Sequence, residues 1–452
     1  MLSSRLPKDL SSSPFFAELE RVKAQVSAET ACGEGLPFID MTVSSPVKAG
    51  LPVEMDAAVE SARSGFGCWN PDAAGWKSAR EAVVEYYRER GGNFTAGQIL
   101  LTASTSEAYS VLFKTFCDPG DVILTPMPGY PLLDTLAQLE HLECAPYFLQ
   151  LRRENARKLA TDERREGAAF RFVLDSDSLL AAPEKAKILL LVSPHNPTGH
   201  CISREEWNAA VRFCEENDMV LVVDEVFGDY AFSDKVKRTW EYVLGLCPPE
   251  PSLSQSSPSK SFSTEGRESI HCRFNDFWDA GGNDLINLPE DGPKCPIFWL
   301  NGLSKAVGSP QLKLGWMAFY APREHFEEIR AALEFVEDAY LSVSAPAQAL
   351  GMSLLPKASA YEAQVKDRLL ANWQTLREAF PAKYCPEVLG GWYAVVRLGE
   401  DDEELTLRLL QEKHVLVQPG FFFDFDEDGW VVISLLQEPA IFKEAVRRMA
   451  DR

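Results

Sequence analysis

A lysine that directly follows a serine, just beyond an apolar run, is the residue of this sequence best suited to covalent chemistry. Residues 297–300 form the run, and Ser304 and Lys305 follow it across a polar turn. A lysine amine can form a Schiff base with a carbonyl cofactor or substrate. A second cation, Lys313 in the glycine-containing bend that follows, would suit an anionic group such as phosphate. Two solvated lysines at a strand end would also explain so short a stretch.

Three adjacent hydroxyl residues begin a second candidate site. Residues 98–107 read as a short strand that runs into a helix, and Ser104 with Glu107 matches the capping box that starts a helix. The free N–H groups of a helix N-terminus attract anions, and Ser104, Thr105 and Ser106 would add three hydroxyls beside them. A helix cap without any ligand is an equally good explanation.

Three further residues that could bind a ligand or take part in catalysis each follow an apolar run. Tyr130 lies on a loop of proline and glycine, where its ring could stack on a flat ligand or belong to the core. Asn196 lies in an Asn-Pro-Thr-Gly loop, and Asp224 directly follows the third run. The three apolar runs are predicted to be buried strands and cover residues 122–125, 187–192 and 219–223.

These strands must position the candidate residues. Continuous apolar strands that alternate with helical segments, such as 204–217, predict an α/β fold with a mostly parallel sheet covered on both faces. In such sheets ligands bind at the carboxyl ends of the strands. We therefore expect Tyr130, Asn196, Asp224 and Lys305 to meet at one shared site.

Charge and composition exclude several classes of partner. The chain has 452 residues, 46% of them hydrophobic, which is enough for a large core and for two domains. Its 67 acidic and 45 basic residues give a formal net charge of −22. This charge argues against nucleic acid and against an anionic membrane surface as partners. No apolar run approaches membrane-spanning length, and the N-terminus lacks the apolar segment of a secretion signal.

Cysteine and histidine usage indicates a reducing compartment and no metal site. Ten cysteines are scattered from Cys32 to Cys385 without a C-x-x-C pair, as in proteins with reduced thiols. Six histidines are also scattered, and although His195 and His200 flank one loop, no cysteine or carboxylate cluster at ligand spacing joins them. We expect a cytoplasmic protein without a bound metal.

Composition and pattern also divide the chain into regions. Residues 1–50 read as an N-terminal arm, 51–325 as a large domain that contains the sheet, and 326–452 as a smaller α+β domain. Within the large domain, 245–296 is predicted to be an insertion, because its first part is of low complexity and rich in serine and proline.

Four short motifs, taken together and in order, resemble those of the fold-type I pyridoxal-phosphate-dependent enzymes of the class I/II aminotransferase family. The resemblance runs from about Ile39 to the C-terminus, apart from 245–296. It implies a three-layer large domain with a mostly parallel sheet and a smaller α+β domain. Each motif is weak alone, but their common order makes the match specific. The motifs are Asn-Pro-Thr-Gly at 196–199, Asp-Glu at 224–225, Ser-Lys at 304–305 and Lys-Leu-Gly-Trp at 313–316.

The resemblance also implies a role for each candidate residue. Lys305 would hold pyridoxal 5'-phosphate as a Schiff base and then move a proton on the substrate. Asp224 would keep the pyridine nitrogen protonated, so that the ring acts as an electron sink. Asn196 would hydrogen-bond the ring oxygen O3′, and Tyr130 would stack on the ring face. The residues implied to bind the phosphate are Ser104, Thr105, Ser304 and Lys313.

The function implied is that of an aminotransferase, which moves an amino group between an amino acid or amine and a 2-oxo acid. The family also implies a homodimer with the cofactor at the interface. A lyase on the same scaffold is an alternative, because the scaffold does not dictate the reaction. A protein that binds the cofactor with little catalysis is a third interpretation. Turnover that depends on a 2-oxo acid would separate the first interpretation from the second.

Three residues differ from the family pattern at the cofactor. Phe227 stands where the family has a tyrosine that contacts O3′, a change that should raise the pKa of the Schiff base. Tyr230 is a nearby phenol that could take over this contact. Gly302 replaces a serine at the phosphate, and Trp69 replaces the loop tyrosine that reaches the phosphate of the partner subunit.

Two further differences concern charged groups. Val432 aligns with the arginine that clamps the substrate carboxylate, and loss of such a clamp typically costs about 2–5 kcal/mol unless another group replaces it. Lys313 replaces an arginine, which is a milder change because phosphate also accepts a point charge. The sequence therefore predicts a largely complete cofactor site and an unusual substrate site.

Overall fold

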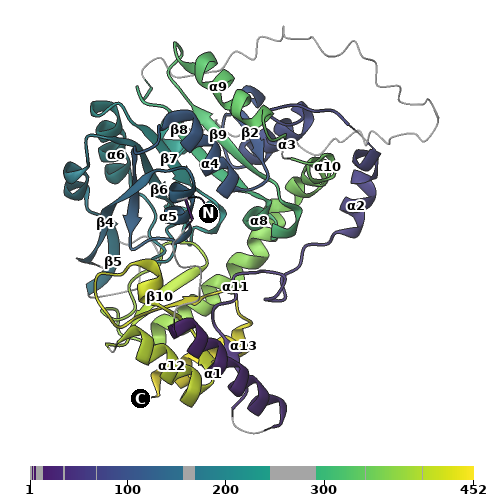
Figure 1. Cartoon of the computed structure of the whole chain (residues 1–452). Helices are drawn as coiled ribbons and strands as arrows, with labels where there is room; N and C mark the ends of the chain where they lie inside the picture. The colour runs from purple at the N-terminus through teal and green to yellow at the C-terminus, as the bar shows by residue number, and fades with distance from the viewer. Residues whose placement is uncertain are drawn as a thin grey trace.

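The computed structural model describes residues 3, 5–6, 14–33, 36–67, 69–155, 168–244, 292–341, 343–399 and 401–451 (Figure 1). Most of the insertion predicted at 245–296 thus lies outside the described residues. Among the helices within these ranges, none is both long and apolar enough to cross a membrane.

An eight-stranded sheet forms the middle of the larger part of the chain, in the order β2-β9-β8-β7-β6-β3-β4-β5. The consecutive neighbours from β8 through β7, β6 and β3 to β4 are parallel, whereas β2, β9 and β5 join antiparallel. The α/β fold with a mostly parallel sheet is therefore confirmed. The strands are β2 Ile99–Thr102, β3 Val122–Met127, β4 Glu143–Asn155, β5 Ala168–Leu174, β6 Ala186–Val192, β7 Val220–Asp224, β8 Ile297–Gly302 and β9 Gly315–Tyr320.

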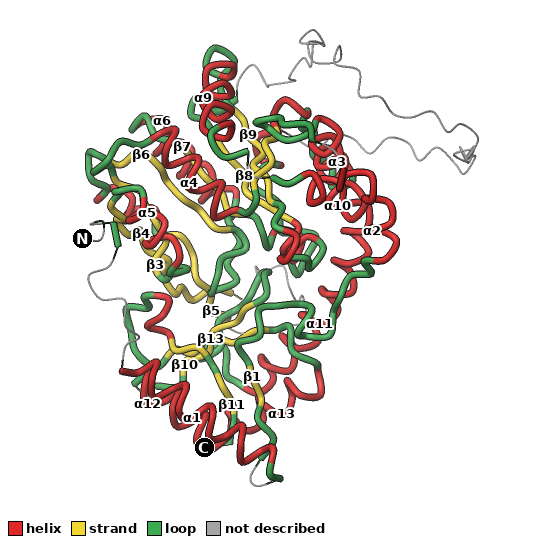
Figure 2. The backbone as a smooth tube through the Cα atoms, turned by 45° about the vertical axis from the view of Figure 1, so that its right-hand side comes forward, coloured by secondary structure: helices red, strands yellow, loops and turns green. Residues whose placement is uncertain are grey.

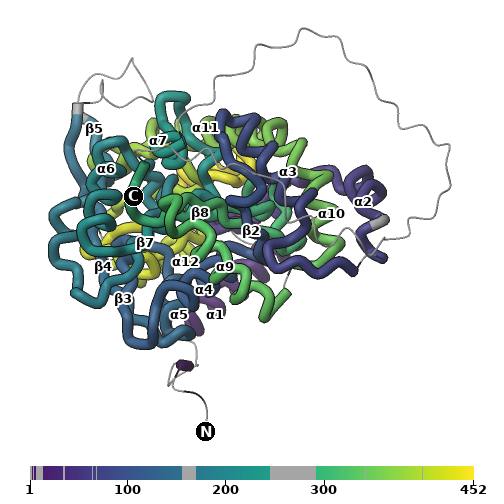
Figure 3. The backbone as a smooth tube through the Cα atoms, turned by 90° about the horizontal axis from the view of Figure 1, so that it is seen from above, coloured from purple at the N-terminus to yellow at the C-terminus, as the bar shows by residue number. Residues whose placement is uncertain are grey.

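Helices cover both faces of this sheet. Successive residues of a strand point to opposite faces, and in these strands the side chains on both faces are apolar and must be buried. Leu189 and Leu191 of β6 belong to one hydrophobic cluster, and Ile188 and Leu190 belong to another. Helices α3, α6 and α10 pack on the first face and α4, α5 and α9 on the second (Figure 3). The helices are α3 Lys77–Arg88, α4 Thr105–Phe116, α5 Leu132–Leu139, α6 Arg204–Glu216, α9 Phe326–Asp338 and α10 Ala345–Leu354.

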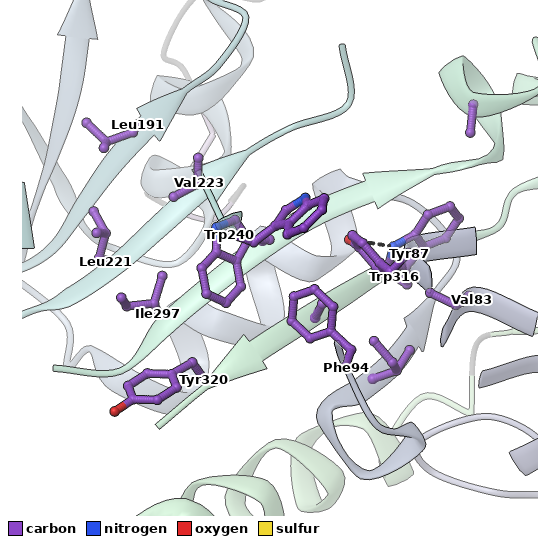
Figure 4. Close-up of a cluster of buried hydrophobic side chains, with 14 of the residues drawn as sticks. Val83, Tyr87, Phe94, Leu191, Leu221, Val223, Trp240, Ile297, Trp316 and Tyr320 are labelled. Atoms are coloured by element: carbon purple, nitrogen blue, oxygen red, sulfur yellow. Dashed lines mark hydrogen bonds between the residues drawn. The ribbon is translucent and has the colours of Figure 1, made fainter. Parts of the chain in front are cut away.

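Large aromatic side chains fill the first of these clusters (Figure 4). The ring of Phe94 lies 4.5 Å from that of Tyr87 and 6.3 Å from that of Trp240, between centroids. The indole N–H of Trp316 donates to the hydroxyl of Tyr87 at 3.1 Å, so its polar atom is satisfied inside the core. This packing joins α3 to β9.

A small antiparallel sheet in the order β10-β13-β12 forms the second part of the fold (Figure 2). The N-terminal arm belongs to this part too, because its β1 pairs in parallel with β11 in a separate two-stranded sheet and α1 packs against α12. The domain boundaries at residues 50 and 325 stay a prediction. The elements are α1 Pro14–Ala31, β1 Ile39–Asp40, β10 Tyr393–Arg397, β11 Val415–Leu416, β12 Gln418–Pro419 and β13 Trp430–Ser434, with helices α11 Ala358–Ala379, α12 Asp402–Lys413 and α13 Pro439–Ala450.

A buried cluster of charges lies just beyond β7. Asp229 is 3% exposed, and its carboxylate accepts hydrogen bonds from Arg90 Nε at 2.8 Å and from the hydroxyl of Tyr86 at 2.7 Å. Arg238 contacts the same carboxylate. Burial alone would raise the pKa of Asp229, but Arg238 and Arg90 outweigh it and lower this pKa to about 2. The cluster joins α3 to the turn after β7.

We predict that Asp229→Asn destabilises the protein strongly, because it leaves Arg90 and Arg238 buried without their shared anion. The expected loss is about 3 kcal/mol or more at pH 7, measured as the shift of the urea unfolding midpoint. Since the folded pKa of about 2 lies below the ordinary value of 3.8, the carboxylate contributes fully above about pH 4. Its contribution should then fade as the pH falls toward 2.

Glu18→Gln is the matched control, because Glu18 forms an exposed ion pair with Arg21 on α1. Exposed pairs contribute little, so this variant should unfold like the wild type. Equal midpoints for Asp229→Asn and the wild type would contradict the prediction.

Candidate active site

One cavity at the carboxyl ends of the parallel strands contains the residues singled out above. Because β3, β6, β7 and β8 run in the same direction, the residues that end or follow them emerge at the same edge of the sheet. The N-terminus of α4 reaches this edge too. The predicted site residues that line the cavity are Ser104, Thr105, Tyr130, Asn196, Asp224, Ser304, Lys305 and Lys313.

Lys305 lies on the short helix α8 (Leu303–Ala306), which begins where β8 ends. Its Nζ lies 4.8 Å from the ring centroid of Trp392 and 5.5 Å from that of Phe227. Burial disfavours the charged amine and lowers the pKa of Lys305 to about 8, against the opposing effect of Asp224. About a tenth of this amine is therefore neutral, and nucleophilic, at pH 7, far more than for a lysine with the ordinary pKa of 10.5.

Asp224 is the last residue of β7 and presents a half-buried carboxylate to the cavity. One oxygen, Oδ2, accepts the hydroxyl of Tyr109 at 2.7 Å, and Oδ1 accepts the backbone N–H of Val226 at 3.0 Å. Burial raises the pKa of Asp224, while these two hydrogen bonds and the charge of Lys305 lower it.

Asn196 lies on a tight loop after β6 whose backbone is bonded internally. His195 N donates to the carbonyl of His200 at 2.7 Å, and Gly199 N donates to that of His195 at 2.8 Å. Burial lowers the pKa of His195 to about 3, so its ring is neutral. Within the described residues Oδ1 of Asn196 is buried without a hydrogen-bond partner. A polar group left unpaired beside a cavity fits a ligand that would bond to it.

The other end of the cavity combines a helix N-terminus with a lysine. Ser104 Oγ accepts the N–H of Glu107 at 3.2 Å and so caps α4. The predicted capping box is only half formed, because the Glu107 carboxylate bonds the N–H of Ala103 instead of returning to Ser104. With Ser304 and Lys313 on the facing turns, this end has the donor set that an anion requires.

Close packing of two turns explains the glycine at position 302. A Cβ on Gly302 would lie 3.0 Å from the Cα of Gly315 and 3.0 Å from the carbonyl oxygen of Leu314. A Cβ on Gly315 would lie 3.0 Å from the carbonyl carbon of Ser104. A side chain at position 302 would therefore require the facing backbone to shift by a few tenths of an ångström.

Tyr230 does not take over the contact that Phe227 lacks. It is fully buried beside Trp392, and its hydroxyl donates to the backbone carbonyl of Lys305 at 2.6 Å. Phe227 does line the cavity. The suggestion from the sequence is thus wrong, because the hydroxyl of Tyr230 supports the turn that carries Lys305.

Val432 and Trp69 lie away from this cavity. Val432 is fully buried in the middle of β13, where it pairs with Val395 and Gln418. Trp69 is 82% exposed and lines a separate hollow with Trp76. The predicted contact of Trp69 with a partner subunit stays a prediction.

Sequence reasoning missed three polar residues that line the cavity, namely Ser44, Tyr109 and Tyr393. Tyr109 lies four residues after Thr105 on α4, so helical spacing could have placed both on one face. Ser44 and Tyr393 come from the N-terminal arm and from β10, and no local pattern connects either of them to β7 or β8. In the described ranges, no three or more His, Cys, Asp and Glu side chains gather where they could hold a metal ion.

Comparisons with known proteins agree with this architecture. A sequence profile described as "Aminotransferase class I and II" matches residues 50–268 and 271–449. Over 438 residues the chain is 21% identical to the glutamate-pyruvate aminotransferase AlaA of Haemophilus influenzae, covering 92% of this chain and 91% of that protein. It is 22% identical over 411 residues to the S-alkyl-thiohydroximate lyase SUR1 of Arabidopsis thaliana, covering 87% and 74%. The crystal structure of an aminotransferase from Escherichia coli has the same fold, with a TM-score of 0.72, 17% identity and coverage of 100% and 97%.

We predict that the amine of Lys305 reacts at a lower pH than ordinary lysines do. Because burial lowers its pKa to about 8, its acylation rate in the cofactor-free protein should be half-maximal near pH 8. Competitive labelling with acetic anhydride, read by peptide mass spectrometry, measures this for each lysine. Lys187, at the start of β6 and so at the opposite edge of the sheet, is the internal reference. Identical pH profiles for the two lysines would contradict the prediction.

Proposed function

Because the chain belongs to the family of class I and II aminotransferases, we propose that it uses pyridoxal 5'-phosphate to transfer an amino group from an amino acid or amine to a 2-oxo acid. One observation carries this proposal: the half-buried amine of Lys305, with a pKa lowered to about 8, shares a cavity with Asp224 and with the unpaired amide oxygen of Asn196.

The donor set around the cavity fits this cofactor. The phosphate would lie at the N-terminus of α4, among the hydroxyls of Ser104, Thr105 and Ser304 and beside the ammonium of Lys313. The pyridine nitrogen would face the carboxylate of Asp224, and Asn196 would bond the oxygen at O3′. Tyr130, which is 46% exposed on its loop, would stack on the ring.

Each residue then performs a step that its environment supports. Pyridoxal phosphate supplies, when bound, an electron sink for negative charge at the Cα of the substrate. Lys305, whose pKa is lowered to about 8 by burial, would bind the cofactor as a nucleophile and, once displaced, would take the proton from Cα as a base. Asp224 as an anion would hold a proton on the ring nitrogen. The cavity lies between the two sheets, because Tyr393 of β10 lines it together with Asp224 of β7.

The substrate end of the cavity is aromatic and carries hydroxyls. Phe227, Tyr393 and Ser44 line it. We propose that these groups, rather than Val432, contact the substrate. Glutamate and pyruvate, named for the Haemophilus influenzae relative, are the first pair to test.

A lyase reaction is the second candidate, and the Arabidopsis thaliana relative favours it because its name is that of a lyase. The lyase and aminotransferase reactions differ in the substrates that they consume, since only amino transfer requires a 2-oxo acid for repeated turnover. Product release from a donor alone, turnover after turnover, would favour the lyase.

We further propose that the protein works as a cytoplasmic homodimer. Trp69 at 82% exposed and Phe335 at 81% exposed are large apolar side chains that a partner subunit would cover. The cysteines within the described residues are all free, which suits a reducing compartment.

We predict that Lys305→Ala abolishes the visible absorbance band that the lysine-bound cofactor gives. In the wild type this band should bleach with an amino donor and return with a 2-oxo acid. Lys187→Ala, at the opposite edge of the sheet, should behave like the wild type. A full-strength band in Lys305→Ala would contradict the assignment of this lysine.

Phe227→Tyr should restore a phenol beside the cofactor, because Phe227 lines the cavity 5.5 Å from the Nζ of Lys305. A phenol that donates to O3′ stabilises the deprotonated form of the lysine-bound cofactor. We therefore expect the pH midpoint of the visible band to fall by about one unit or more relative to the wild type. A pH titration of the absorbance measures this midpoint, and an unchanged value would show that the added hydroxyl does not reach O3′.

A further inference from the structure

The hydroxyl of Tyr109 bonds directly to the carboxylate that faces the cavity. Tyr109 is 4% exposed on α4, the helix whose N-terminus closes the anion end of the cavity. Its hydroxyl donates to Oδ2 of Asp224 at 2.7 Å, a length that is ordinary for an O–H donor and a carboxylate. One helix thus carries both the capping group of the anion site and a donor to the half-buried acid.

Few other groups act on this carboxylate. The backbone N–H of Val226 bonds the other oxygen, Oδ1, at 3.0 Å. Lys305 and Tyr130 are the remaining titratable groups that act on Asp224 in the described part of the chain. Its neighbours across the strands, Val192 and Leu300, are apolar and offer no polar side chain.

We propose that Tyr109 is a positioning residue that keeps Asp224 ionised and aimed into the cavity, so that Asp224 can hold a proton on the ring nitrogen of the cofactor. This inference rests on the proposed function for the identity of the ring. A buried carboxylate has lost its hydration, and an O–H donor stabilises its charged form more than its neutral form. A neutral Asp224 would share its own proton with the ring nitrogen, and the ring would lose the positive charge that makes it an electron sink.

The state of the phenol supports this role. Burial and the nearby Asp224 charge raise the pKa of Tyr109 well above its ordinary value, so its hydroxyl stays a donor across the physiological range. The hydrogen bond from Tyr109 in turn opposes the rise that burial causes in the pKa of Asp224. Asp224 therefore keeps the phenol of Tyr109 protonated, and Tyr109 favours the ionised form of Asp224, which are the two states that their hydrogen bond requires.

Tyr109→Phe tests the proposal because it removes the hydroxyl and keeps the ring. In the cofactor-free full chain, ¹³C NMR of labelled aspartate carboxyl carbons follows the ionisation of Asp224, and its signal is assigned by its loss in Asp224→Asn. We expect Asp224 to titrate roughly one to two pH units higher in Tyr109→Phe than in the wild type. An unchanged titration would overturn the proposal.

Tyr147→Phe is the matched control. Tyr147 is also a buried phenol, but its hydroxyl donates at 2.9 Å to the backbone carbonyl of Leu190 and makes no contact with Asp224. Its loss can lower the urea unfolding midpoint, yet it should leave the Asp224 titration where it is. A comparable shift in both variants would mean that any buried hydroxyl matters equally, and would also overturn the proposal.

The loaded protein gives a second readout that a purely structural role would not change. With cofactor labelled by ¹⁵N at the ring nitrogen, the chemical shift should move toward the unprotonated value in Tyr109→Phe and not in Tyr147→Phe. We expect kcat to fall about tenfold with KM nearly unchanged, because substrate contacts remain. An unchanged ¹⁵N shift counts against the proposal.

A wild type that binds no cofactor would refute the proposed function, while the carboxyl titration still decides whether Tyr109 controls Asp224.

Discussion

Asp224 and Lys305 are two opposite charges that the fold removes from water, and much of the surrounding structure compensates for that burial. They emerge from the adjacent strands β7 and β8, which are parallel, so both must end at the same edge of the sheet. Burial raises the pKa of the acid and lowers that of the amine to about 8. Each charge partly offsets the cost of the other, and the hydroxyl of Tyr109 offsets more of the cost at Asp224.

Backbone contacts next to Lys305 hold the turn that carries this lysine at the same edge of the sheet. Gly302 lets the turn that carries Lys305 approach Gly315, and Gly315 in turn lies against Ser104 at the start of α4. The hydroxyl of Tyr230 holds the backbone of Lys305 from the other side at 2.6 Å. These contacts leave the lysine side chain free while its backbone is tied down, which is what a residue needs if it must act as nucleophile and base in turn.

The departures from the family pattern affect the two ends of the cavity differently. At the anion end, Gly302 lacks one hydroxyl and Lys313 keeps a cation, while the N-terminus of α4 and its hydroxyls remain. At the substrate end, Val432 is part of the core of the small sheet, and aromatic side chains with two hydroxyls line the cavity. On the proposed function, the donors for the cofactor and the groups proposed to contact the substrate thus lie at different ends of the cavity, as expected when one scaffold serves different substrates.

Much of the sheet and of the cofactor end could be predicted from the sequence because their signals are local. Apolar runs marked β3, β6, β7 and β8, and the direction shared by parallel strands was enough to bring Asn196, Asp224 and Lys305 together. Only the tertiary structure decided which groups surround them. Tyr109 on Asp224, Tyr230 on Lys305 and Tyr393 at the substrate end arise from packing between segments far apart in the chain. Such contacts depend on how helices and a second sheet fit against the first, and short-range periodicity carries no information about that fit.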